Sequence, residues 1–180
     1  MENKSVSSFK TALNYALITA VILIVYGLIM FLLGVGFETL KDIGWIQYII
    51  VIGIMILAIR AQKIAQGGFL TYGKGFTVGF LMVLIAFVIT GIYGYFYFTS
   101  IDPGMTEDIV AHSINTAEQN IRESNPDVSQ AEIDQVISYA EKFTTPVWMV
   151  IWSLVSNLVV GTVISLIIPI FMMKKNPADI

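Results

Sequence analysis

The sequence predicts an all-α membrane protein with four transmembrane helices and an extramembrane amphipathic helical hairpin between the third and the fourth. Four apolar runs fill most of the 180 residues, hydrophobic residues make up 56% of them, and charged residues only 13%. Acidic and basic residues lie between the runs instead of inside them. A helix needs about 20 apolar residues to cross the hydrocarbon core of a bilayer. Because no water is present there to bind free backbone groups, each run is expected to be helical.

The predicted spans cover about 13–35, 43–60, 75–98 and 147–173 of a single integral membrane domain, 1–180. Lys4 and Lys10 precede the first span, as in a signal peptide, but its apolar stretch exceeds the about 7–15 residues of such a region. We therefore expect it to be retained as a signal anchor. Trp45 and Trp148 open the second and fourth spans, and aromatic residues of this kind mark membrane interfaces.

The distribution of basic residues predicts the orientation, since cytoplasmic loops carry excess Lys and Arg. Seven of the ten basic residues fall in the two terminal segments and in the loop after the second span. They are Lys4, Lys10, Arg60, Lys63, Lys74, Lys174 and Lys175. Of these, Arg60, Lys63 and Lys74 are expected at the inner interface, where long basic side chains reach the headgroups. Both termini of this multi-pass membrane protein are predicted to be cytoplasmic.

Residues 102–145 are predicted to form the outer hairpin. Asp102-Pro103 is a helix start, with Asp as the cap and Pro in the first turn. Asn125-Pro126 interrupts the chain, and Ser129-Gln130-Ala131-Glu132 then fits a capping box for a second helix. Apolar residues recur at helical spacing in both segments, and the other positions are rich in acids. The hairpin is either a solvated cap or a docking site for a partner or for cations.

The fourth span carries small and polar residues every four positions, which places them on one helix face. The members are Ser153, Asn157, Gly161 and Ser165. Such a face favours close helix packing, because small residues let backbones approach and polar side chains bond across the contact. The alternative interpretation is the lining of a substrate path.

The residue types also exclude several activities. The chain has no cysteine and one histidine, so thiolate sites and clusters of imidazole ligands are excluded. No catalytic residues, metal site, cofactor or nucleic-acid partner is expected. Proton relays and ion-coupled sites need ionisable residues at depth in the membrane, and the predicted spans carry no Asp, Glu, Lys, Arg or His except Arg60 at the inner end of the second.

The layout resembles the bacterial membrane proteins grouped as domain of unknown function 4199. The resemblance rests on the Gly- and Phe-rich entry to the third span (67–76), the aromatic exit into Asp102-Pro103, the acidic hairpin, and the 164–169 ending followed by Lys174-Lys175. It covers nearly the whole chain and implies a bacterial membrane location, but it supplies no activity.

The sequence therefore predicts a non-enzymatic accessory or structural membrane component that contacts the lipid bilayer and either a membrane-protein partner or further copies of itself. The alternative is a small oligomeric transporter or channel that uses the polar face of the fourth span.

Overall fold

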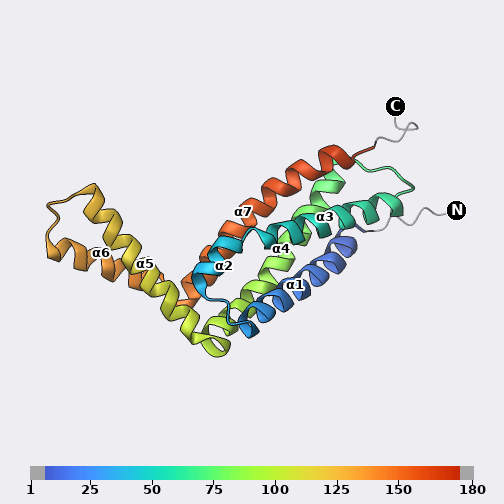
Figure 1. Ribbon diagram of the computed structural model, residues 1–180. Coiled ribbons are helices and arrows are strands. Elements are labelled where there is room, and N and C mark those ends of the chain that lie inside the picture. The colour runs from blue at the N-terminus through green and yellow to red at the C-terminus, as the bar shows by residue number, and fades with distance from the viewer. Residues whose placement is uncertain (1–6, 175–180) are drawn as a thin grey trace.

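The computed structural model describes residues 7–174, and the regular elements in this range are helices (Figure 1). Their bounds are α1 Ser8–Leu32, α2 Phe37–Ile43, α3 Ile46–Ala65, α4 Tyr72–Phe96, the π-helix η1 Tyr97–Ile101, α5 Pro103–Ser124, α6 Gln130–Phe143 and α7 Pro146–Met172. Four of them are long and apolar enough to cross a membrane: α1, α3, α4 together with η1, and α7. The predicted all-α class with four long apolar helices is confirmed.

Helix α4 is the centre of the four-helix bundle. In the most apolar 18-residue stretch of α4, 39% of the residues are buried, against 17% in the corresponding stretches of α1 and α7. Its buried residues recur at three- and four-residue spacing and so form one continuous stripe: Gly75, Val78, Gly79, Met82, Val83, Ala86 and Phe87. The buried residues of α1 are all small, namely Thr11, Ala12, Ala16, Thr19 and Ala20, which lets the two backbones approach closely.

The second apolar helix differs from the predicted 43–60. Residues 37–43 form the separate short helix α2, and α3 then runs from Ile46 to Ala65. It therefore extends past Arg60 and includes Gln62 and Lys63. The polar side chains in this last part of α3 have partners on neighbouring helices, since Gln62 bonds to Thr11 of α1 and Lys63 to Met172 of α7. The other three long helices begin and end within a few residues of the predicted bounds, except that α1 begins at Ser8.

Two halves of the bundle are distinguished below. The terminal half lies toward the start of α1, the α3–α4 loop and the end of α7, and the distal half lies toward α2 and the α5–α6 pair (Figure 1). The α3–α4 loop turns at Gly67 and Gly68, whose φ values of 73° and 89° favour glycine. Leu70 then forms an antiparallel bridge with Lys174, which joins this loop to the end of α7.

Helices α5 and α6 pack against each other and extend away from the bundle beyond the distal half (Figure 1). Both predicted helix starts are confirmed. The Asp102 carboxylate accepts a hydrogen bond from the Met105 N–H, and Ser129 and Glu132 form the complete capping box. These starts form because the side chains satisfy backbone N–H groups that have no partner within the first helical turn.

Candidate functional site

The polar and small face of α7 is divided between two environments. Gly161 and Ser165 are buried in the terminal half of the bundle. Ser153 and Asn157 instead line a cavity in the distal half. The sequence places all four residues on one face, but the structure brings only Gly161 and Ser165 into tight contact with α4.

Gly161 and Ser165 are in close contact with α4. A Cβ atom on Gly161 would overlap the side chain of Val83, so no larger residue fits without movement. Ser165 Cβ lies 3.3 Å from the position that a Cβ on Gly79 would occupy. The Ser165 hydroxyl donates to the Gly161 carbonyl oxygen at 2.5 Å within α7. One turn further, Pro169 packs against Gly75. Glycine on one helix therefore faces a side chain on the other at each of these levels.

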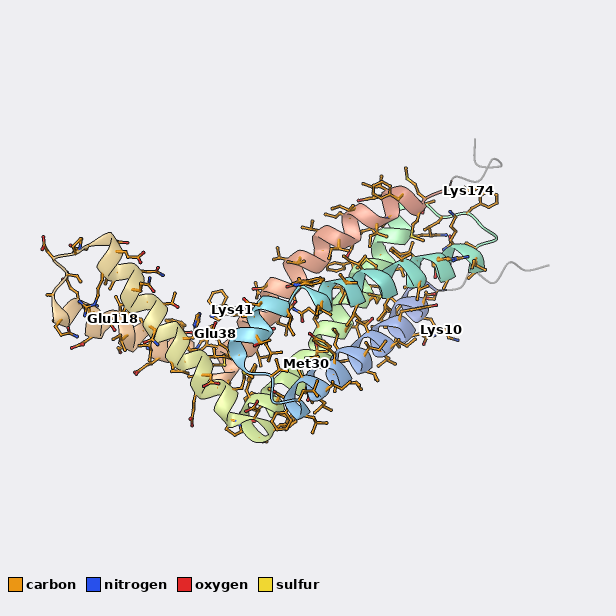
Figure 2. The ribbon with its side chains drawn as sticks, in the orientation of Figure 1. Lys10, Met30, Glu38, Lys41, Glu118 and Lys174 are labelled. Carbon is orange, nitrogen blue, oxygen red and sulfur yellow. The ribbon has the colours of Figure 1, made fainter. Side chains whose placement is uncertain are left out.

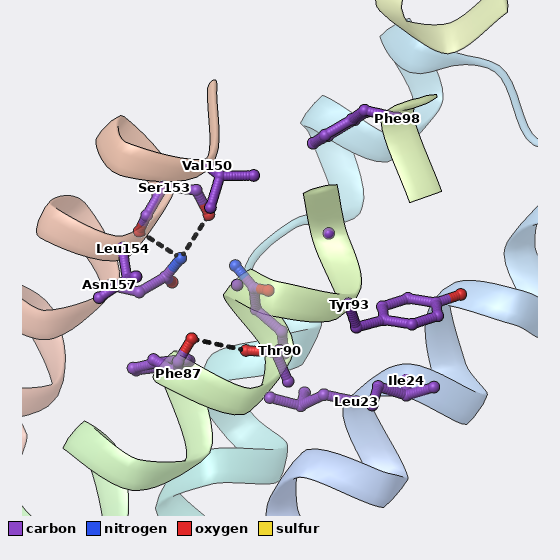
Figure 3. Close-up of a pocket in the computed structure, with 13 residues that line it drawn as sticks. Leu23, Ile24, Phe87, Thr90, Tyr93, Phe98, Val150, Ser153, Leu154 and Asn157 are labelled. Carbon is purple, nitrogen blue, oxygen red and sulfur yellow. Dashed lines mark hydrogen bonds between the residues drawn. The ribbon is translucent and has the colours of Figure 1, made fainter. Parts of the chain in front are cut away.

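Next to this contact, toward α5 and α6, the distal half contains a cavity of about 190 Å³ (Figure 3). All four long helices contribute to its lining, with Leu23 from α1, Gln47 from α3, Thr90 and Tyr93 from α4, and the α7 residues. The Asn157 amide nitrogen donates to the Ser153 carbonyl oxygen at 2.8 Å and to Ser153 Oγ at 3.1 Å. Figure 3 shows this amide on the side of α7 that faces α4.

Three polar atoms around this region are shielded from solvent but have no hydrogen-bond partner among residues 7–174: Asn157 Oδ1, Tyr93 Oη and Tyr26 Oη. The Gln47 amide also forms no hydrogen bond within that part of the chain. Unpaired polar groups are costly in an apolar medium. The three shielded atoms are enclosed by protein atoms, so a molecule in the cavity would meet them only after a side chain rotates, and the Gln47 amide is the polar group left open.

The terminal half shows the opposite arrangement. Thr11 Oγ1 donates to Gln62 Oε1 at 2.6 Å, and Gln62 Nε2 donates to Ser8 Oγ at 3.3 Å, which ties α1 to α3. Lys63 Nζ donates to the Met172 carbonyl oxygen at 2.8 Å, and Tyr72 Oη donates to the Leu166 carbonyl oxygen at 3.1 Å. Both of the latter bonds hold the end of α7.

The predicted inner-interface residues thus have different surroundings. Lys63 is half-buried and bonded to α7, whereas Arg60 and Lys74 are exposed on α3 and α4. In Figure 2, Lys10 and Lys174 lie at the end of the bundle that carries the termini, and Glu118 lies on the α5–α6 pair at the opposite end. Every Asp and Glu among residues 7–174 belongs to the segments of that opposite end.

Short helix α2 contacts α5 through polar and aromatic groups. The His112 ring lies 3.0 Å from Glu38 and packs edge-on against Phe37. The hydrogen bond from Lys41 holds the pKa of Glu38 below its ordinary value, and His112 lowers it further. No group of three His, Asp or Glu side chains within residues 7–174 is close enough to hold a metal ion.

Sequence reasoning missed three of the polar residues that matter in this arrangement. Gln47 and Thr90 lie within or beside apolar runs, and Gln62 lies beyond the predicted end of the second span. A usable signal was present for Gln62, because it continues the spacing of the buried residues Met55, Ala58 and Ile59 along α3. Nothing in the sequence pairs it with Thr11, which is 51 positions away.

A bundle of four apolar helices whose outer surface is rich in exposed Leu, Ile, Val and Phe is the architecture of a helical integral membrane protein. The chain belongs to the family described as "Protein of unknown function (DUF4199)", whose sequence profile matches residues 14–174. The predicted family is therefore confirmed. A comparison with curated proteins found no match, and neither did a comparison with solved structures.

Proposed function

We propose that this chain is a non-enzymatic accessory component of the bacterial inner membrane that docks a partner through its α5–α6 pair. In this proposal both termini lie in the cytoplasm and the pair forms an extramembrane hairpin in the periplasm. The observation that supports it most directly is the position of the pair, which extends from one end of the bundle and contacts it near η1 and α2.

The charge of the pair supports a basic partner. Between residues 103 and 143 the acids are Glu107, Asp108, Glu118, Glu123, Asp127, Glu132, Asp134 and Glu141, and the bases are Arg122 and Lys142. Arg122 is already paired with Glu118 at 2.8 Å. Most of the acids are exposed and remain available to a basic face of another membrane protein, where complementary charge steers association.

The orientation is testable because the chain has no cysteine of its own. Ser7 and Ser124 are exposed at opposite ends of the molecule. In intact spheroplasts, a membrane-impermeant thiol reagent is expected to label Ser124→Cys and not Ser7→Cys. Labelling of Ser7→Cys alone would overturn the proposed orientation, and labelling of both would place the pair and the amino terminus on the same side.

The docking role is testable by neutralising exposed acids that form no hydrogen bond in the described structure. The variant Glu107→Gln/Asp127→Asn/Glu141→Gln is expected to lose a stoichiometric partner that co-purifies with the wild type in mild detergent at low salt. A matched control changes three exposed neutral residues of α5 and α6, Asn120→Ala/Gln135→Ala/Ser138→Ala, and is expected to retain the partner. Equal retention by both variants would contradict docking through charge.

A small oligomeric transporter or channel is the second candidate, and the observation that favours it is the cavity beside Ser153 and Asn157. The fit of Gly161 against Val83 closes the α7 face toward the terminal half, so a path along this face would require α4 and α7 to separate. Solute flux into liposomes that contain the purified protein, if it is lost in the Asn157→Leu variant, would favour the transporter or channel over the docking role.

A further inference from the structure

We propose that the distal half of the bundle holds a binding site for an uncharged amphiphile, with a hydroxyl-bearing head in the cavity between α1, α3, α4 and α7 and an apolar chain in the adjoining hollow. This inference is independent of the docking role, because none of the acids of the α5–α6 pair lines either space.

The chemistry of the head follows from the lining of the cavity. Its thirteen lining residues include no Asp, Glu, Lys, Arg or His, so nothing there compensates an ionic head. Asn157 Oδ1 accepts hydrogen bonds only, has no donor within the described residues and is enclosed by protein atoms, so a ligand reaches it only when the Asn157 amide rotates. The Gln47 amide both donates and accepts, whereas the Tyr93 hydroxyl is enclosed by protein atoms and its ring extends toward α1 (Figure 3). A head that offers both O–H donors and oxygen acceptors matches this set, and a plain hydrocarbon leaves it unpaired.

The size of the head follows from the volume. An engineered apolar cavity of about 150 Å³ holds benzene. The cavity here measures about 190 Å³ and therefore accepts a head of about six to ten non-hydrogen atoms. A glycerol unit falls within that range.

The apolar chain of the ligand has a place next to the head. A second hollow of about 420 Å³ shares five lining residues with the cavity, including Gln47 and Tyr93, so the two spaces adjoin there. Its other walls are mostly apolar, with Met30 from α1, Leu40 from α2, and Met105 and Ile109 from α5. Tyr26 also lines this hollow, with its unpartnered hydroxyl enclosed by protein atoms.

Lys41 is the one charged residue that lines the hollow, and its amine already lies 2.8 Å from the Glu38 carboxylate. Its charge is therefore compensated without a ligand. The combination of a compensated cation and a polar cavity without charge favours a neutral glyceride over a fatty acid. The rival occupant of the cavity is a group of water molecules, which also satisfy polar linings of this size.

The test uses the full chain in phospholipid nanodiscs and a 1-monoacylglycerol that carries a photoactivatable group in its acyl chain. Saturable labelling of peptides from α1, α4 and α5, which line the hollow that takes the acyl chain, is expected, and unlabelled 1-mono-oleoylglycerol should compete at least tenfold better than oleate. Asn157→Leu and Gln47→Leu are each expected to weaken the apparent affinity about tenfold, as loss of one or two hydrogen bonds does.

Ser156→Leu is the matched control, because Ser156 is exposed on α7 and does not line the cavity. The affinity of this variant for the monoacylglycerol should equal that of the wild type. Gln47→Leu keeps the experiment decisive if Asn157→Leu fails to fold, since it breaks no hydrogen bond of the described structure. Labelling that is not saturable, as expected if water alone fills the cavity, would overturn the proposal. So would wild-type affinity in both cavity variants, or competition by oleate equal to that of the glyceride.

Discussion

The terminal and distal halves of the bundle are built from the same four helices, but polar side chains are hydrogen-bonded between helices in the terminal half and lack such partners in the distal half. In the terminal half, Gln62 is fully buried and bonded to Thr11 and Ser8. In the distal half, Gln47 lies on the same helix near its other end, lines a cavity, and forms no hydrogen bond within the described chain. Paired polar groups fasten one half, and unpaired groups leave the other able to accept a ligand.

Glycine positions show the same contrast. Gly161, Gly79 and Gly75 lie where an added Cβ would meet a side chain at 3.3 Å or closer. At Gly94, beside the cavity, the nearest atom would lie 3.8 Å away, which is an ordinary contact, whereas at Gly91 Leu154 Cδ1 would lie 3.1 Å away. The α4–α7 contact is therefore closed through the terminal half and as far as Gly91, and it opens only near Gly94.

The largest expected effect comes from overfilling the closed contact. Gly161→Leu would drive its side chain into Val83, and such overpacking costs about 1–3 kcal/mol or more of folding free energy. The measurement is thermal unfolding in detergent. Gly53→Leu is the control, because nothing lies within 4 Å of a Cβ added at that position. Gly161→Leu with an unfolding temperature equal to that of Gly53→Leu would show that the contact with α4 is not closed. Partial recovery in Gly161→Leu/Val83→Ala would assign the loss to this pair.

The next prediction makes the same substitution at the two ends of α3. Gln62→Leu removes the acceptor of the buried Thr11 hydroxyl, and we expect a loss of about 0.6–2 kcal/mol, the range for interhelical hydrogen bonds in membranes. Gln47→Leu removes no hydrogen bond and is expected to leave stability unchanged or to raise it. The measurement is the midpoint of unfolding in a denaturing detergent titration. Equal losses in the two variants would remove the distinction between the halves.

The sequence predicted features that depend on near neighbours better than features that depend on helix contacts. The caps at Asp102 and Ser129 were predictable because the side chain and the N–H group that it accepts from are three residues apart. The spans were predictable because apolar length alone defines them. The cavity was not predictable, since it arises where four helices fail to fill the space beside Asn157, and that depends on the crossing of distant segments.

A smaller effect is expected outside the bundle, where helix α6 begins. Ser129→Ala removes the hydroxyl that accepts from the Glu132 N–H, and loss of such a cap costs about 1 kcal/mol. Hydrogen exchange of the whole protein in detergent should become faster across 131–136, with the bundle unchanged. Ser138→Ala, an exposed change within the same helix, is the control. Unaltered exchange in Ser129→Ala would mean that packing of α6 against α5 holds this turn without the cap.

The smallest expected effect is the pH dependence of the same turn. Hydrogen bonds from the Ser129 N–H and hydroxyl lower the pKa of Glu132 relative to its ordinary value. Because the pKa is lower in the folded state, this contribution to stability is complete above the unfolded pKa of about 4.3 and is lost as the pH falls through the folded value. Exchange at 131–136, corrected for the intrinsic rate, should therefore rise below about pH 4. In Glu132→Gln the amide still completes the capping box but does not titrate, so its exchange should show no such rise. An identical rise in both proteins would assign the acid sensitivity to another carboxylate of the α5–α6 pair.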